Sequence, residues 1–245
     1  MMKAAMLFMI LGICGGGTAK AAELFEKDVI KTSAGNLEIT FIGHGSLMMK
    51  FGGKIIHVDP YSKLADYAKL PKADIIFITH EHQDHLDLAA LQKVTTTKTV
   101  VVLTAKCAEK VPSGIIMKNG DTRKVEGITV ETVPAYNIEH KRDNGQPFHP
   151  KGDGNGYVLT FADKRLYIAG DTEKVPEMGL LKQIDIAFLP MNLPYTMTPA
   201  MVADAARSFK PKVLYPYHFG ETDTAQLVTL LKENRDIEVR IRRMK

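Results

Sequence analysis

The stretch "THEHQDHLD", residues 79–87, crowds three histidines, one glutamate and two aspartates into nine positions directly after the apolar run "ADIIFI". An apolar run that ends in a polar turn is typical of a buried strand. His80 and His82 are two residues apart, so on an extended strand end they would point to the same side and could hold one ion. Asp84 and His85 follow where the chain turns, and they could reach a second ion beside the first.

Imidazole mixed with carboxylate suits zinc, manganese or ferrous iron better than calcium. Histidines at a turn between a strand and a helix can also be plain exposed polar residues. Four candidate ligands within six positions favour a metal site over that alternative.

Short β-branched runs separated by glycine-containing turns follow from Leu37 onward, which predicts strands in both halves of the chain. Two of them fit hairpins with tight turns at Gly52-Gly53 and Ala162-Asp163. The predicted strands cover residues 37–43, 47–59, 73–79, 99–104, 128–135, 156–171, 184–191, 212–218 and 237–242.

Helices are predicted at residues 86–94, 173–183, 198–209 and 222–234, the third with Thr198 as N-cap and Pro199 at its first position. The two halves are similar in outline, although their sequences show no close repeat. We expect one α/β domain of two packed sheets with helices outside.

The first residues have the pattern of a secretory signal peptide, with a short basic start, an apolar stretch and a small-residue exit. A cut after Ala21 fits the A-x-A rule, and a cut after Ala22 is the alternative. Cys14 raises a lipoprotein reading, which bulky Ile13 disfavours. The apolar run is well short of the roughly 20 residues of a membrane anchor. We therefore expect a signal peptide at 1–21, a domain at 22–245, and a periplasmic or secreted protein.

Loss of residues 1–21 would remove Lys3, Lys20 and no acid, which lowers the formal charge from +4 to +2. Such a balance predicts no nucleic-acid partner and no membrane-surface partner. Only Cys107 would remain, so no disulfide can form within the mature chain. The expected partner is a small-molecule substrate, and the oligomeric state is left open.

Four motifs in order resemble the metallo-β-lactamase superfamily of metal-dependent hydrolases. They are H-x-H-x-D-H at 80–85, "IGHGSLMMKFGGKIIHVDPY" at 42–61, "AGDT" at 169–172 and "YPYHFGE" at 215–221. The second is similar to the opening hairpin of the branch that includes ascorbate-6-phosphate lactonase-like proteins and N-acyl phosphatidylethanolamine phospholipase D-like enzymes. The resemblance implies a four-layer αββα sandwich with the metals at one edge, between the sheets.

The resemblance also implies two divalent ions, zinc first and manganese or ferrous iron as alternatives. The implied ligands are His80, His82 and a third histidine for one ion, Asp84, His85 and His218 for the other, and Asp171 as a bridge. For the third histidine we favour His149, with His140 and the position of Asn137 as alternatives.

Other residues of interest lie in stretches that the family places near the metals. Asp59 is expected to accept the second ring proton of a metal histidine, with a plain turn before Pro60 as the alternative. His44 and Asn137 should lie near the metals or the pocket, and His57 is interpreted as structural. The stretch "NLPYTMTP" at 192–199 is expected to line the pocket, with Tyr195 as the best candidate for a polar contact.

The implied activity is hydrolysis of an ester, lactone or phosphodiester by a metal-bridging hydroxide, with Asp84 moving a proton. The chain lacks a G-x-S-x-G elbow, which fits a metal-based nucleophile. A bridging Asp171 is more typical of lactonases and phosphodiesterases than of β-lactamases. The three basic residues between 136 and 155 could meet an anionic phosphate, or could form a solvated loop. The alternatives are a metal-binding protein without turnover and a di-iron redox protein.

Overall fold

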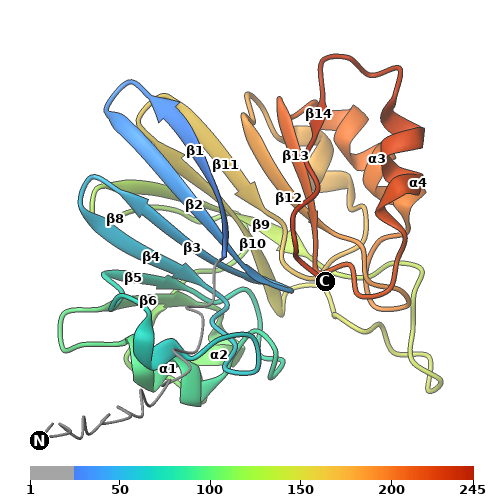
Figure 1. Cartoon of the computed structure of the whole chain (residues 1–245). Coiled ribbons are helices and arrows are strands. Elements are labelled where there is room, and N and C mark those ends of the chain that lie inside the picture. Colours follow the sequence, from blue (N-terminus) through green and yellow to red (C-terminus); the bar gives the residue numbers. More distant parts are fainter. Residues whose placement is uncertain (1–24) are drawn as a thin grey trace, which may run out of the picture.

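Each half of the chain forms one seven-stranded sheet, and the two sheets pack face to face (Figure 1). The computed structural model describes residues 25–245, so the predicted signal peptide, its cleavage site and Cys14 lie outside the described residues. The first sheet contains β1 (Glu26–Thr32), β2 (Gly35–Gly43), β3 (Ser46–Phe51), β4 (Lys54–Val58), β5 (Ile75–Phe77), β6 (Val100–Leu103) and β7 (Ile115–Ile116). The second contains β8 (Thr122–Val125), β9 (Ile128–Ala135), β10 (Gly154–Phe161), β11 (Lys164–Ile168), β12 (Ile186–Pro190), β13 (Val213–Tyr217) and β14 (Glu238–Val239).

Helices cover the outer faces of both sheets (Figure 1), so the predicted four-layer αββα sandwich is confirmed. They are α1 (Leu88–Val94), α2 (Ala105–Ala108), α3 (Pro199–Phe209) and α4 (Thr224–Leu231), with short 3-10 helices η1 (Tyr67–Lys69) and η2 (Pro176–Leu180). Among residues 25–245 no helix is both long and apolar enough to cross a membrane.

The two sheets repeat one topology. Neighbouring strands from β1 to β4 and from β8 to β11 are antiparallel, and those from β4 to β7 and from β11 to β14 are parallel. The repeat extends to single hydrogen bonds, because Asp74 accepts from the Ile55 amide (2.7 Å) as Asp185 accepts from the Arg165 amide (2.9 Å). The similarity that the sequence shows only in outline is therefore a close structural repeat.

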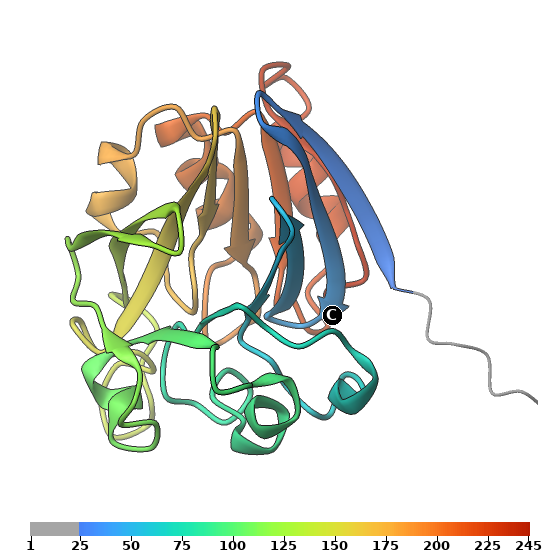
Figure 2. The same ribbon diagram turned by 90° about the vertical axis from the view of Figure 1, so that its left-hand side faces the viewer.

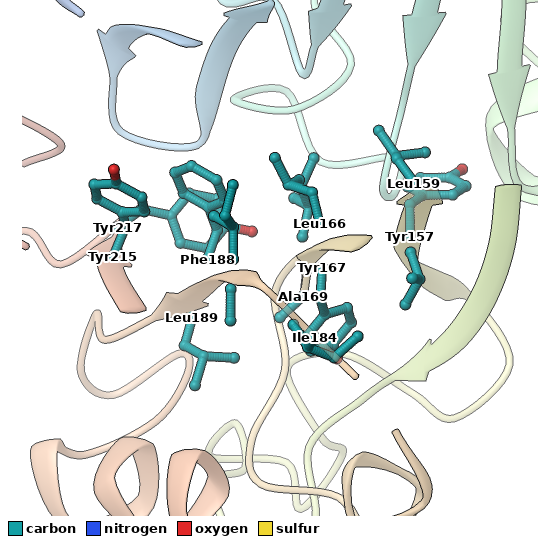
Figure 3. Close-up of a cluster of buried hydrophobic side chains, with 14 of the residues drawn as sticks. Tyr157, Leu159, Leu166, Tyr167, Ala169, Ile184, Phe188, Leu189, Tyr215 and Tyr217 are labelled. Carbon is teal, nitrogen blue, oxygen red and sulfur yellow. The ribbon is translucent and has the colours of Figure 1, made fainter. Parts of the chain in front are cut away.

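The core lies between the sheets and follows the alternation of strand side chains. Ile75 and Phe77 of β5 face the other sheet, whereas Ile76 packs outward in a cluster with α1. Figure 3 shows buried side chains on both faces of the second sheet. On the face toward the first sheet, the rings of Phe188 and Tyr215 stack with centroids 5.0 Å apart. Such buried aromatic pairs fix how neighbouring strands pack.

Both predicted hairpins are present. Gly52 and Gly53 join β3 to β4 with φ angles of 55° and 80°, which glycine adopts without steric cost. Ala162 and Asp163 join β10 to β11.

Two predictions of secondary structure were wrong. The helix expected at 173–183 is only the short η2, because Pro176 and Gly179 oppose a regular helix. The strand expected at 237–242 pairs only at Glu238–Val239. The sequence reasoning also missed α2, β1, β7 and β8. In Figure 2 the first strand (blue) lies on the same side of the molecule as the C-terminal segment (red), where Asp28 of β1 bonds to Arg242 (2.8 Å).

Candidate metal centre

The predicted metal ligands come together where several strands end. His80 to His85 follow β5, Asp171 follows β11, and His218 follows β13. His149 lies in the connection from β9 to β10, and His44 lies in the turn from β2 to β3. The carboxyl ends of strands are where open α/β sheets place their sites. A register shift in the β2–β3 pair between Phe41 and Gly43 precedes the turn that carries His44.

One group consists of His80, His82 and His149, whose candidate ligand atoms lie within 4.8 Å of one another. The rings of His80 and His82 approach to 3.1 Å between Nε2 and Nδ1. Of the three alternatives for the third ligand, only His149 joins this group.

The other two alternatives have different partners. His140 Nδ1 lies 2.8 Å from Glu173 Oε1 and 3.0 Å from the Thr196 carbonyl. Asn137 contacts His149 instead of the cluster centre: its Oδ1 accepts from the His149 amide (2.9 Å) and lies 2.6 Å from Nδ1 of the same ring. This contact leaves Nε2 of His149 free to face the cluster.

A second group consists of His44, Asp84, His85 and His218. Nε2 of His85 and Nε2 of His218 lie 3.6 Å and 3.5 Å from Asp84 Oδ2. His44 Nε2 is nearer to the same oxygen, at 3.0 Å, which is a direct hydrogen-bond distance. His44 is therefore placed to hold the Asp84 carboxylate.

Asp171 lies between the two groups and is buried. Its Oδ2 is 3.4 Å from His149 Nε2 on one side and 3.5 Å from His218 Nε2 on the other. Its Oδ1 is 3.5 Å from His85 Nε2. A carboxylate with histidines of both groups around it has the position of a bridging ligand.

The unpaired atoms of the cluster fit a metal. Of the six buried side-chain nitrogen and oxygen atoms that lack a hydrogen-bond partner within residues 25–245, four belong to His85, Asp171 and His218. Leaving a buried polar group unsatisfied costs about 1–3 kcal/mol. Three of these atoms are of the kind that coordinates a divalent ion: Nε2 of His85, Oδ1 of Asp171 and Nε2 of His218. Coordination of a metal would therefore satisfy all three.

The protonation of the first group also suits a metal. Burial lowers the pKa of His149 to about 4 and the pKa of His80 well below its usual 6.5. Burial opposes ionisation of Asp171, but the neighbouring His218 and His85 outweigh it and hold the pKa of that carboxyl well below its usual range. Neutral imidazoles and an ionised carboxylate are the forms that bind metal.

Asp59 supports the cluster from behind. It is fully buried, and its Oδ2 lies 2.8 Å from His85 Nδ1, opposite the Nε2 that faces Asp171. The Thr79 amide and hydroxyl also donate to it, at 2.8 Å and 2.6 Å. Such a partner fixes the orientation and tautomer of a metal histidine. Gly45 completes this packing, because a Cβ there would lie 2.9 Å from His85 Cε1.

His57 behaves as the structural residue that was expected. It is fully buried, its Nε2 lies 3.0 Å from the Pro71 carbonyl, and burial lowers its pKa to about 4. It belongs to neither group of candidate ligands.

Glu173 is a supporting residue that the sequence reasoning missed. Its buried carboxylate accepts hydrogen bonds from the amides of Ile138 (2.7 Å), Glu139 (2.7 Å) and His140 (2.6 Å). It also accepts from Nδ2 of Asn137 (3.2 Å), the residue that contacts the His149 ring. The available signal was its place directly after the "GDT" strand end.

A cavity of about 480 Å³ opens onto the cluster. Tyr195 lines it as predicted, and its half-exposed ring meets Phe148 edge-on with centroids 5.0 Å apart. Asn192, from the same predicted stretch, lines it too, whereas Phe148 was not singled out from the sequence. The lining residues are His82, Gln83, Asp84, Arg142, Phe148, His149, Asp171, Asn192, Tyr195 and His218.

Comparisons with known proteins agree with this geometry. The family model described as "Beta-lactamase superfamily domain" matches residues 38–218. A UPF0173 metal-dependent hydrolase from Pelotomaculum thermopropionicum is 28% identical over 220 residues, which are 84% of this chain and 96% of that protein. One from Thermococcus onnurineus is 33% identical over 197 residues, which are 75% of this chain and 85% of that protein. A crystal structure of a proposed metal-dependent hydrolase from Parabacteroides distasonis matches with a TM-score of 0.87 and 50% identity, covering 91% of this chain and all of that one. The residues matched by the family model include the whole cluster from His44 to His218.

Proposed function

The chain belongs to the metallo-β-lactamase superfamily and is a metal-dependent hydrolase, and from this premise we propose that it uses two divalent ions to hydrolyse an ester, lactone or phosphodiester. The observation that carries the proposal is the place of Asp171 between two groups of histidines, with its buried Oδ1 unpaired. One ion would be held by His80, His82 and His149, and the other by Asp84, His85 and His218, with Asp171 shared.

The combination of imidazole and carboxylate ligands suits zinc, and because no thiolate takes part, manganese and ferrous iron are alternatives. When bound, the ions would lower the pKa of water and polarise the carbonyl or phosphoryl oxygen of the substrate.

The residues of the chain have separate tasks around those ions. Asp59 orients the His85 ring through a contact with its Nδ1. Asn137 orients the His149 ring in the same way. Asp84 is the more accessible of the two carboxylates, with a side chain 34% exposed against 4% for Asp171. His44 holds its Oδ2, so Asp84 is placed to pass a proton between the cavity and solvent.

A cysteine-based mechanism does not fit. Cys107 is fully buried, and burial raises the pKa of its thiol to about 11. A buried neutral thiol of this kind is inert rather than nucleophilic.

The first test is metal analysis of the purified protein, followed by assays on phosphodiesters, lactones, thioesters and β-lactams beside Asp84→Ala. We expect about two equivalents of metal and turnover of an ester, lactone or phosphodiester that falls by more than about 100-fold in Asp84→Ala. Bound metal without turnover of any substrate, and no difference between the two proteins, would show a metal-binding protein instead.

Export to the periplasm or the medium is part of the proposal. The pattern of residues 1–21 supports it, and a cut after Ala21 would leave every described residue in place. Mass spectrometry of the native protein should find an N-terminus at Ala22, whereas a retained Met1 would contradict export by this route.

A further inference from the structure

We propose that the substrate carries a second anionic group, a carboxylate or a phosphate, and that Arg142 binds it. The inference rests on the proposed function, because it assigns a further part of the same cavity. Arg142 lines that cavity together with Asp84, Asp171 and His218 of the candidate metal centre.

Arg142 has no acidic partner among the described residues. Lys151, on the same loop, pairs instead with Glu177 at 2.8 Å. The Arg142 guanidinium donates from Nη2 to the Phe148 carbonyl at 3.2 Å and lies over the Phe148 ring, 5.2 Å from its centroid. A guanidinium has five N–H donors in a fixed fork, so most of them remain for a ligand.

The backbone around Arg142 is held in place. Its amide donates to the Gln146 carbonyl (2.8 Å) and its carbonyl accepts from the Gly145 amide (2.8 Å), with an antiparallel bridge between Lys141 and Pro147. This small hairpin leads directly into Phe148 and His149. The backbone that carries the cation is therefore fixed relative to a candidate metal ligand, which reduces the entropy cost of binding.

The other charges of the cavity make an anion the matching ligand. The carboxylates of Asp84 and Asp171 are assigned to the ions, so the cavity offers no acid to Arg142. Two neutral polar groups are also free, because the side-chain amide of Asn192 and the hydroxyl of Tyr195 have no hydrogen-bond partner within residues 25–245, whereas the Asn192 backbone amide donates to Thr196. Arginine binds carboxylate and phosphate through paired hydrogen bonds.

The test measures binding without turnover. Isothermal titration of the metal-loaded protein would compare butyrate with succinate, glutarate and adipate, which add a second carboxylate at increasing distance, and with 3-phosphonopropionate. Each ligand has one carboxylate for the ions, so the preference for the dianion reports the second site. The variants are Arg142→Ala, Arg142→Lys and Lys141→Ala, the last being an exposed cation of the same loop that does not line the cavity.

We expect the wild type to bind at least one dianion about tenfold or more tightly than butyrate. Arg142→Ala should abolish that preference, Arg142→Lys should keep part of it because charge remains without the fork, and Lys141→Ala should keep it. The succinate and 3-phosphonopropionate arms share a spacer of the same length, so they show whether the second site prefers a carboxylate or a phosphonate. The inference is overturned if the wild type prefers no dianion, if the preference survives in Arg142→Ala, or if Lys141→Ala loses it equally. Absence of hydrolysis would contradict the proposed function but would not alter this result.

Discussion

The loop after β5 and the loop after β12 begin from equivalent places in the two sheets. The Asp59 amide donates to the Phe77 carbonyl (3.0 Å) as the Ala169 amide donates to the Phe188 carbonyl (3.1 Å). Three residues beyond each phenylalanine, the first loop has His80 in the cluster and the second has Met191 in the core. The same scaffold therefore supports different tasks: one loop supplies metal ligands, and the other supplies Asn192 and Tyr195 to the cavity.

The largest effect should come from the first loop. His82→Ala removes a candidate ligand that is only half-buried, so the fold should survive while turnover falls by more than about 100-fold and one metal equivalent is lost. The matched change in the second loop is Asn192→Ala, which should keep both metals and raise KM. Metal analysis with steady-state kinetics checks both, and loss of metal in Asn192→Ala would break the comparison.

A smaller effect is expected from Asp59, the buried carboxylate that contacts the metal histidine His85 in the first half of the chain. Asp59→Asn should weaken metal affinity or activity about 10- to 100-fold, because His85 loses the carboxylate that orients it. Asp185→Asn is the control in the second sheet, since it also removes a buried carboxylate that accepts from a backbone amide. Chelator competition measures the metal affinity of both variants. Asp185→Asn should lower the stability of the fold and leave the metal affinity unchanged. Equal metal affinities in the two variants would refute the role given to Asp59.

The loop that carries His149 gives a test of the third metal ligand, with a smaller expected effect. Asn137→Ala should lower metal affinity by roughly tenfold, because Nδ1 of His149 loses its partner. His140→Ala, on the same loop but outside the cluster, should keep wild-type metal content. A chelator titration in which His140→Ala loses the metal and Asn137→Ala does not would reverse the choice of third ligand.

The smallest effect concerns the contact between the halves at β1. Burial would raise the pKa of Asp28, but hydrogen bonds from Tyr215 and Arg242 outweigh it and leave the pKa below its usual 3.8. The carboxylate thus stabilises the fold above about pH 3.8, and this contribution is lost as the pH falls through the lowered value. Asp28→Asn should lower the free energy of unfolding by roughly 1 kcal/mol at neutral pH. It should also make the free energy of unfolding fall less steeply at acidic pH. Urea unfolding from pH 7 to pH 3 measures it, and parallel curves for both proteins would exclude the coupling.

Most of the fold follows from local patterns in the sequence. Runs such as residues 73–79 alternate between the two faces of a buried strand, and tight turns such as Gly52-Gly53 mark hairpins. β1 escaped prediction because its "EKDVIKT" has no continuous apolar run, and its side chains alternate between half-buried and exposed. Its place in the sheet depends on pairing with β2 rather than on its own composition.

The site residues also fall into those that local sequence predicts and those that depend on distant contacts. The spacing of His80, His82, Asp84 and His85 is a local signal, and the structure brings all four into the cluster. The choice of His149 over His140 depends on Glu173, which lies 33 residues beyond His140 and holds the loop by its amides. No spacing rule within the loop contains that information.

The contact between Asp28 and Arg242 joins positions 214 residues apart. A chain that is synthesised from its N-terminus can form β1 early, but it cannot clamp that strand to the second sheet until residue 242 has been made. The entropic cost of closing a loop grows only slowly with its length, so the order of synthesis, more than the size of the loop, sets when this contact can form. Arg242 thus fastens a strand that was synthesised 214 residues earlier.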